Sequence, residues 1–405
     1  MMSFFSKPKN HKVIMALDVS SSSVGGIVIK IDGATGQAEI VASARKSANY
    51  LFDVDLKAAM RCSLESLKNV LSKLAQDYPG KPDNVLCVFS SPWFISQAKI
   101  LNLKKGKPFE VKEELFGKII YEEEESFKNN LPKWSADGQN SYSAEFIEHE
   151  DIKTELNGYF TENPFGKTAK TLKIHIYLSM GLKDFIGKIK KEVSGKFGAL
   201  KITFKTFPMV AFRALNSIMK TEEDFILTNV GGEMTDLLLV KGGALEDVVS
   251  FPKGINFLYR KIASDSNTFL KEAPSRLKTY LRGHMAAGSA EKLRLAIKEN
   301  EKEWGALFEK AIASMSESHL LPENVFLIGD YAAQKIFSRN AENAELSKYA
   351  VLGKPFSVKK IHPGWVAHYL RLKNPDTLGK WRNEIDEAGP DTALMMEAFL
   401  ASRIF

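Results

Sequence analysis

The sequence predicts an α/β protein of two similar lobes, with a small α+β subdomain inserted in the first lobe. A strand, a tight turn and a returning strand over residues 13–31 recur in the second half of the chain, over residues 225–244. A later strand, at 324–328, breaks at a glycine and leads into a helical pattern. The 405 residues are enough for two or three domains of ordinary size.

The first hairpin has a polar turn of the kind that holds a phosphate group. Asp18 ends its first strand, and Ser20, Ser21, Ser22 and Ser23 form the turn. The hydroxyl and backbone N–H groups of such a turn point at an anion, and Asp18 is placed to hold a hydrated Mg²⁺ beside it. The residues also allow a plain β-hairpin in which Asp18 only caps its own turn.

The second hairpin is centred on glycines, which let a backbone approach a ligand closely. Its candidate binding residues are Asn229, Gly231, Gly232, Glu233 and Thr235.

The third element supplies two more candidates, Gly329 and Asp330, where a strand ends and a helix begins. A helix N-terminus at this place would face whatever lies above the strand.

In this order, the three elements resemble the actin, Hsp70 and sugar-kinase superfamily, in which two like domains clamp a nucleotide. Over most of residues 12–402 the sequence is similar to the FtsA/PilM branch, with 17–24 as the first phosphate loop and 229–236 as the second. The resemblance implies ATP and Mg²⁺ as cofactors, with Asp18 binding the metal through water. It places Lys278 beside the sugar or base of the nucleotide, although on sequence alone Lys278 is equally a surface lysine.

The motifs depart from the family pattern where hydrolysis depends on them. Ser20 stands where the family usually has glycine, and Asn229 replaces an aspartate that holds a metal-bound water. Phe207 replaces a water-orienting Glu or Gln before a proline, and Gly25 and Gly26 replace a basic residue. Because hydrolysis needs a positioned water, a metal and a group to orient the attack, we expect little ATPase activity and assign no catalytic residue. ATP is expected to bind weakly or not at all.

The expected domains follow the three elements. They are the first lobe at 12–82, the inserted subdomain at 83–180, the second lobe with its hairpin at 181–250, a helical subdomain at 251–320, and the rest of the second lobe with a closing helix at 321–405. In FtsA and PilM an inserted subdomain at this place makes protein contacts. Tyr159, Phe160 and Phe165 are candidates for such contacts, and packing within the insert is an equal alternative.

Composition excludes several other classes of protein. The hydrophobic fraction of 44% and charged fraction of 26% are those of a globular protein. Two cysteines are too few for a disulfide framework or a zinc site. The net charge of +7 comes from lysines interspersed with glutamates, so no nucleic-acid partner is expected. No apolar run is long enough to span a bilayer, and we expect a cytoplasmic protein that is peripheral to the membrane at most.

The resemblance therefore implies a cytoplasmic scaffold that recruits or organises a membrane-associated machine, either in type IV pilus assembly, as PilM does, or in cell division, as FtsA does. The expected partner is a protein, the cytoplasmic tail of a membrane protein, and self-association into filaments stays open. The chain stops after the closing helix at 391–405, which favours the PilM-type role. The alternative is an active ATPase or a kinase of the same superfamily.

Overall fold

The computed structural model describes residues 11–48, 55–131, 143–219, 223–373 and 391–405. The strands are β1 (His11–Val19), β2 (Ser23–Asp32), β3 (Ala38–Ser47), β4 (Asn84–Phe89), β5 (Phe94–Glu110), β6 (Ala144–Leu156), β7 (Tyr159–Phe160), β8 (Thr168–Leu182), β9 (Ile202–Thr206), β10 (Phe225–Val230), β11 (Thr235–Lys241), β12 (Ala244–Phe251), β13 (Asn324–Ile328) and β14 (Ser357–Lys360). The helices are α1 (Leu56–Asp77), α2 (Glu113–Asn129), α3 (Lys183–Phe197), α4 (Phe207–Met219), α5 (Ile255–Ser266), η1 (Leu270–Glu272), α6 (Ala273–Leu281), α7 (Ala287–Ser318), α8 (Tyr331–Ala341), η2 (Ala344–Tyr349), α9 (Pro363–Tyr369) and α10 (Thr392–Ile404).

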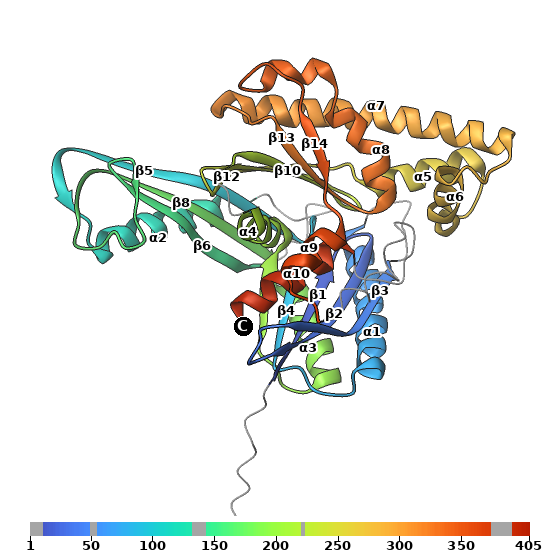
Figure 1. Cartoon of the computed structure of the whole chain (residues 1–405), viewed down its shortest axis with the longest axis horizontal. Coiled ribbons are helices and arrows are strands. Elements are labelled where there is room, and N and C mark those ends of the chain that lie inside the picture. The colour runs from blue at the N-terminus through green and yellow to red at the C-terminus, as the bar shows by residue number, and fades with distance from the viewer. Residues whose placement is uncertain (1–10, 49–54, 132–142, 220–222, 374–390) are drawn as a thin grey trace, which may run out of the picture.

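Two sheets of the same design form the two lobes (Figure 1). The lobe-1 sheet has the order β3-β2-β1-β4-β9, and the lobe-2 sheet has the order β12-β11-β10-β13-β14. In each sheet the first three strands of the lobe are antiparallel neighbours, and the next two are added in parallel. The predicted α/β fold of two similar lobes is confirmed.

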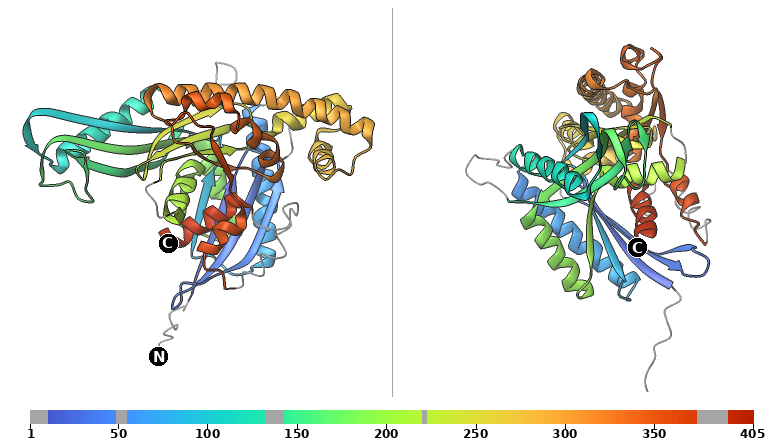
Figure 2. Two further views of the ribbon diagram at one scale, coloured as in Figure 1. Left: turned by 45° about the horizontal axis from the view of Figure 1, so that its top comes forward. Right: turned by 90° about the vertical axis from the view of Figure 1, so that its left-hand side faces the viewer.

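The layers follow from strands that are apolar on both faces. One core lies between the two sheets and includes Ile14 and Leu86 of lobe 1, Leu227 of lobe 2, and buried side chains of α4 and α10. A second core covers the other face of the lobe-1 sheet under α1 and α3. A third covers the other face of the lobe-2 sheet under α5, α7 and α8 (Figure 2).

The insert is a separate sheet, β5-β8-β6-β7, with α2 on one face and a core of its own. It projects from the side of the two lobes (Figure 1). The expected boundary at residue 83 does not match this arrangement, because β4 pairs with β1 in the lobe-1 sheet and the insert sheet begins at Phe94.

The closing helix, which the expected division at 321–405 put with the second lobe, contacts both lobes. Helix α10 packs against β1 and β2 of lobe 1, against α4, and against α9 of lobe 2. Its side chains Leu394 and Met395 are fully buried in the core between the sheets. Within the described ranges, no helix has the length and apolar character needed to cross a membrane.

Candidate functional site

The two predicted turns meet in space. The backbone N–H of Glu233 donates to the hydroxyl of Ser21 at 3.0 Å, and the hydroxyl of Ser91 donates to Asp236 at 2.8 Å. A Cβ placed on Gly232 would lie 2.8 Å from the Cβ of Ser22, so only glycine permits this approach. The structure therefore brings the first and second turns together at the junction of the lobes.

Hydrogen bonds within the first turn use its polar groups. The N–H and hydroxyl of Ser20 both donate to the carbonyl of Ser23, at 3.0 and 2.9 Å. The hydroxyls of Ser20 and Ser22 lie 3.3 Å apart. Ser20 is the residue that replaces the family glycine, and its side chain stabilises the turn rather than projecting from it.

Asp18, the expected metal-water ligand, is paired with a guanidinium group. Arg45 of β3 lies 2.8 Å from the carboxylate of Asp18, and it also donates to the hydroxyl of Ser23 at 2.6 Å. Its Nε lies 2.7 Å from the carboxylate of Asp391, which is the N-cap residue of α10. Burial raises the pKa of Asp18, and the guanidinium opposes this shift.

Gly25 makes room for this pair. Gly25 and Arg45 face each other across β2 and β3, and a Cβ on Gly25 would lie 2.6 Å from Nη2 of Arg45. The site therefore contains a cationic side chain, Arg45. Strand β3 supplies it, whereas the resemblance placed a basic residue just after the first turn, where Gly25 and Gly26 stand. Sequence reasoning missed Arg45, and the available signal was the Gly25–Gly26 pair in a strand interior, which marks a close approach.

Glu397 of α10 lies near the same cluster. It is fully buried, and neither of its carboxylate oxygens has a hydrogen-bond partner. Burial and the negative charge of Asp18 raise its pKa well above the ordinary value. The shift favours the neutral form of Glu397, so the carboxylates that Arg45 contacts directly are those of Asp18 and Asp391.

The second turn is held from the side of lobe 2. The N–H groups of Ile255 and Asn256, at the start of α5, donate to the carbonyls of Gly231 and Gly232 at 3.0 and 2.9 Å. The carboxylate of Glu233 accepts two hydrogen bonds from Arg260, at 2.9 and 2.7 Å, and it also accepts one from the side chain of Asn256. Glu233 is therefore tied to α5.

The remaining residues predicted for the second turn have buried partners. Thr235 donates to the carbonyl of Lys253 at 2.7 Å and accepts from the indole of Trp304 at 3.0 Å. Asn229 lies 3.5 Å from Asp236, whose carboxylate also accepts from the hydroxyl of Ser250 at 2.7 Å. These contacts give Thr235 and Asn229 structural roles in lobe 2.

Gly329 and Asp330 lie beside the end of β10, which leads into the second turn. A Cβ on Gly329 would come within 3.2 Å of the carbonyl of Val230, the last residue of β10. The carboxylate of Asp330 caps α8 by accepting from the N–H of Ala333 at 2.7 Å, and the hydroxyl of Tyr259 lies 3.3 Å away.

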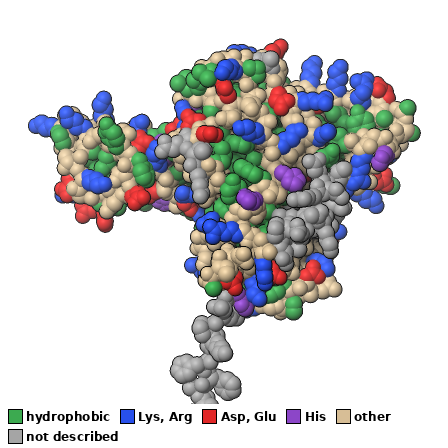
Figure 3. All heavy atoms as spheres, viewed as in Figure 1, with side chains coloured by type: hydrophobic (Ala, Val, Ile, Leu, Met, Phe, Trp, Pro, Cys, Tyr) green, Lys and Arg blue, Asp and Glu red, His purple; other side chains and the backbone are tan. Residues whose placement is uncertain are grey.

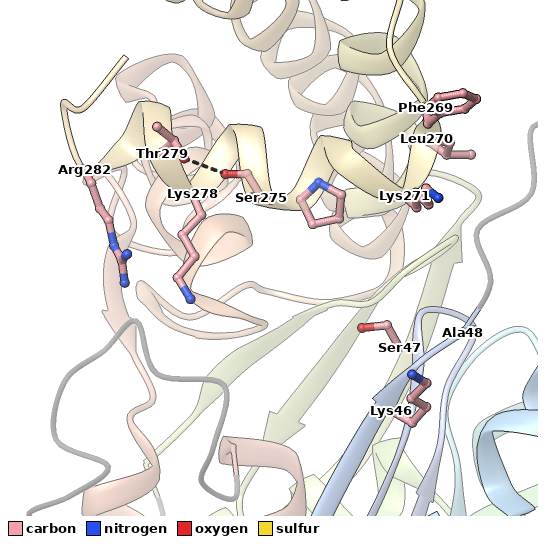
Figure 4. Close-up of a pocket in the computed structure, with 11 residues that line it drawn as sticks. Lys46, Ser47, Ala48, Phe269, Leu270, Lys271, Ser275, Lys278, Thr279 and Arg282 are labelled. Carbon is pink, nitrogen blue, oxygen red and sulfur yellow. Dashed lines mark hydrogen bonds between the residues drawn. The ribbon is translucent and has the colours of Figure 1, made fainter. Parts of the chain in front are cut away.

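Lys278 lines a cavity of about 860 Å³ between β3 and α6 (Figure 4). The described residues that line it include four cations and no carboxylate: Lys46, Ser47, Ala48, Phe269, Leu270, Lys271, Pro274, Ser275, Lys278, Thr279 and Arg282. The N–H of Ala48 donates to the carbonyl of Ser22 at 2.8 Å, so the cavity adjoins the first turn. Its electrostatics suit an anion.

The residues at the junction do not fit a magnesium–triphosphate. Magnesium binds through carboxylates and water, yet the carboxylate of Asp18 is paired with Arg45 and the second turn has the neutral Asn229. The N–H groups of Ser20, Gly231 and Glu233 are bonded to protein oxygens, so they are not directed at a phosphate.

A buried glutamate that sequence reasoning missed joins the insert to lobe 1. Glu148 of β6 accepts from the N–H of Thr206 at 2.9 Å and from the hydroxyl of Ser179 at 3.1 Å, and Lys205 lies 3.5 Å away. Thr206 directly precedes Phe207 at the start of α4. Burial raises the pKa of Glu148 to about 7.

The Glu148→Gln variant is expected to remove a pH dependence of stability. The pKa of the Glu148 carboxyl rises on folding from 4.5 to about 7, so the protonated carboxyl favours the folded state fully at pH values below 4.5. This contribution to stability is lost as the pH rises from 4.5 to about 7. The slope is at most about 1.4 kcal/mol per pH unit. Urea unfolding between about pH 4.5 and about pH 7 should show the variant gaining stability relative to the wild type as the pH rises. The exposed Glu110→Gln variant is the control, and identical profiles for both variants would contradict the prediction.

Comparison with known proteins identifies the fold. No protein-family model matches the sequence, and no curated protein does. The structure of the PilM–PilN type IV pilus biogenesis complex matches with a TM-score of 0.60 and 15% identity, over 96% of this chain and 98% of that chain. The fold is actin-like. The ethanolamine utilization protein EutJ of Carboxydothermus hydrogenoformans matches with a TM-score of 0.44 and 13% identity over 87% and 85% of the two chains. The MamK double helical filament matches with a TM-score of 0.41 and 10% identity, over 86% of this chain and 94% of that chain.

The similarity to PilM extends over nearly the whole of both chains, so the actin-like lobes and the insert are covered together. The expected actin-like fold with a PilM-like insert, divergent in sequence, is confirmed. Identity at this level shows the fold alone. Among the site residues, Arg45 departs most from the pattern that the resemblance implied, because β3 supplies this cation and the chain just after the first turn does not.

Proposed function

We propose that this actin-like protein is a cytoplasmic scaffold that does not hydrolyse ATP efficiently and that organises a membrane-associated machine through a protein partner. The observation that carries the proposal is the Arg45 guanidinium, 2.8 Å from Asp18. A divalent cation next to this carboxylate would face a fixed positive charge, and the electrostatic repulsion disfavours metal binding. The contact between Ser21 and Glu233 supports the same reading, because the turns are held to each other.

Phosphate release and thermal stability of the purified protein test the first half of the proposal. We expect turnover with Mg²⁺ and ATP far below about one per second, the low end of ordinary enzymes. A nucleotide that binds only the folded state raises the melting temperature, so magnesium should add nothing to any shift that ATP alone produces. Turnover near about one per second that the Asp18→Asn variant abolishes would overturn the proposal in favour of an active ATPase.

The partner proposed is the cytoplasmic tail of a membrane protein, and the machine is a type IV pilus or a related assembly. The PilM–PilN complex supports this choice, because the fold match covers 98% of the chain in that structure. We place the partner site on the insert, since the insert projects from the lobes and has a sheet and core of its own.

Pull-down with the tails of membrane proteins encoded near the gene tests the second half. Ala98 and Tyr177 face each other at the base of the insert, so residues 99–176 can be replaced by two glycines without separating β5 from β8. We expect this variant to lose the partner. The junction variant Ser21→Ala is expected to keep it. A deletion variant that melts cooperatively and still binds the partner would refute the assignment to the insert.

A further inference from the structure

The far end of the insert exposes aromatic side chains. We define the insert tip as residues 104–109 and 157–170, which lie at the end of the sheet remote from the two lobes (Figure 1). Tyr159 is 78% exposed, Phe160 60% and Phe165 38%. By contrast, the largest side chains of the lobes, such as Trp304 and Phe308, are fully buried. Phe165 packs edge-to-face on Phe116 of the insert core, with ring centroids 5.5 Å apart, whereas the more exposed rings of Tyr159 and Phe160 indicate an interaction surface.

The segment that carries these rings is held in place by hydrogen bonds. The side-chain oxygen of Asn157 accepts from the N–H groups of Lys170 and Thr171 at 2.8 and 3.2 Å. The N–H of Gly166 donates to the carbonyl of Val111 at 3.0 Å, and the N–H of Phe165 donates to the side chain of Asn163. The rings are therefore presented by an ordered turn, which lowers the entropic cost of docking.

The same tip is basic. It contains one glutamate, Glu162, and five exposed lysines: Lys104, Lys105, Lys107, Lys167 and Lys170. Residues 105–108 bulge out of the sheet, with only Lys170 opposite them. The structure gives these lysines no ion pair with any other described residue. Figure 3 shows basic side chains beside hydrophobic ones along the upper edge of this end of the molecule, and acidic side chains along its lower edge.

We propose that the insert tip docks on the surface of an anionic lipid bilayer. The amphipathic ring of Tyr159 suits the level of the lipid headgroups, and the apolar ring of Phe160 suits the boundary between headgroups and acyl chains. Lysines at that level are attracted to the anionic lipids around them. The bulge of residues 105–108 and the edge strand β7 place both kinds of side chain at the far end of one rigid subdomain.

The arrangement of the rings favours a bilayer over an acidic protein. Tyr159 and Phe160 are successive residues of an edge strand, so their side chains point to opposite faces of the sheet. The two side chains project from the edge of the sheet on opposite faces, whereas a protein partner of standard size needs a continuous surface of about 800 Å². A fluid headgroup layer can surround this edge and contact the side chains on both faces. This inference goes beyond the proposed function, because lipid binding needs neither the partner tail nor the junction of the lobes.

Co-sedimentation of the full chain with phosphatidylcholine vesicles, with and without phosphatidylglycerol, tests the proposal. We expect binding only to the anionic vesicles, and we expect it to weaken as salt is added. The Lys105→Gln/Lys107→Gln variant should bind about thirty-fold more weakly. The Tyr159→Ser/Phe160→Ser variant should bind at least about ten-fold more weakly. A matched control, Lys46→Gln/Lys271→Gln, removes the same charge from the cavity in the body and should bind as the wild type does.

A Phe160→Trp variant gives a second readout, because an indole that enters the headgroup layer shifts its fluorescence to the blue. Equal binding by the tip variants and the control, or no blue shift with anionic vesicles, would overturn the proposal. If the tip variants lose the protein tail in the pull-down while the wild type ignores vesicles, the surface belongs to an acidic protein and the proposal is again overturned. These outcomes are distinct from a failure of the proposed function, which the phosphate-release and pull-down assays report.

Discussion

Replacing Arg45 by alanine is expected to lower the free energy of unfolding by about 3 kcal/mol or more, measured by urea denaturation at neutral pH. The side chain of Asp18 is 4% exposed and that of Arg45 is 20% exposed, so the pair lies mostly out of water. Removal of the guanidinium leaves the carboxylate of Asp18 buried without a counter-charge, and Asp391 loses its partner at 2.7 Å.

The cause of this loss can be separated from loss of packing. An unpaired Asp18 has a further raised pKa, so the Arg45→Ala variant should lose additional stability as the pH rises above about 4. Adding Asp18→Asn to Arg45→Ala should recover part of the loss, because the amide carries no charge. The neighbouring Lys46→Ala variant, on an exposed residue of the same strand, should change stability by less than about 0.5 kcal/mol. Equal stability of the Arg45→Ala and Lys46→Ala variants would contradict the role given to the pair.

Gly254→Ala is the second substitution for which we expect a large loss, about 3 kcal/mol or more. Gly254 precedes α5 in an extended conformation that any residue adopts, so the reason lies in space and not in backbone strain. A Cβ at this position would lie 2.3 Å from the carbonyl oxygens of both Gly231 and Gly232. Because a backbone carbonyl cannot rotate out of the way as a flexible side chain can, the start of α5 must shift outward. This shift breaks its hydrogen bonds to the second turn.

Gly187→Ala in α3 is the matched control for this substitution. A Cβ there meets nothing within 4 Å, and alanine should stabilise the helix by about 0.5–1 kcal/mol. Thermal and urea unfolding of the two variants give the comparison. If Gly254→Ala unfolds at the same urea concentration as the wild type, then α5 does not support the second turn as the structure indicates.

The sequence predicted the repeated hairpins because their signals are local. Apolar strands and glycine or serine turns are encoded within about twenty residues, and each returned as a hairpin with the expected turn. It also predicted that the two turns lie together, through their order along the chain. Strand β4 was misplaced because an apolar run carries no information about which sheet it joins, and only pairing with β1 decides this.

The sequence predicted which turns come together at the junction of the lobes, but it did not predict the partners of the residues in them. Asp18, the serines of the first turn and Gly231 and Gly232 all come to the junction of the lobes. What the motifs could not show is which partners those groups already have. Arg45 reaches Asp18 from a different strand, and Arg260 holds Glu233 from a helix further along the chain. Such pairs depend on tertiary packing over distances that a motif does not span.

The packing of α10 on the first sheet has a consequence for how the protein is made. Residues 11–89 are synthesised early, yet part of the apolar surface that includes Ile14 and Leu86 is covered by residues 392–404, the rest being covered by α4 and lobe 2. During translation that part stays open to water and to other nascent chains until residues 392–404 have been synthesised. Contacts so distant in sequence form slowly, and chains in this state aggregate readily. The protein should therefore depend on chaperones during its synthesis, even if the finished molecule is stable.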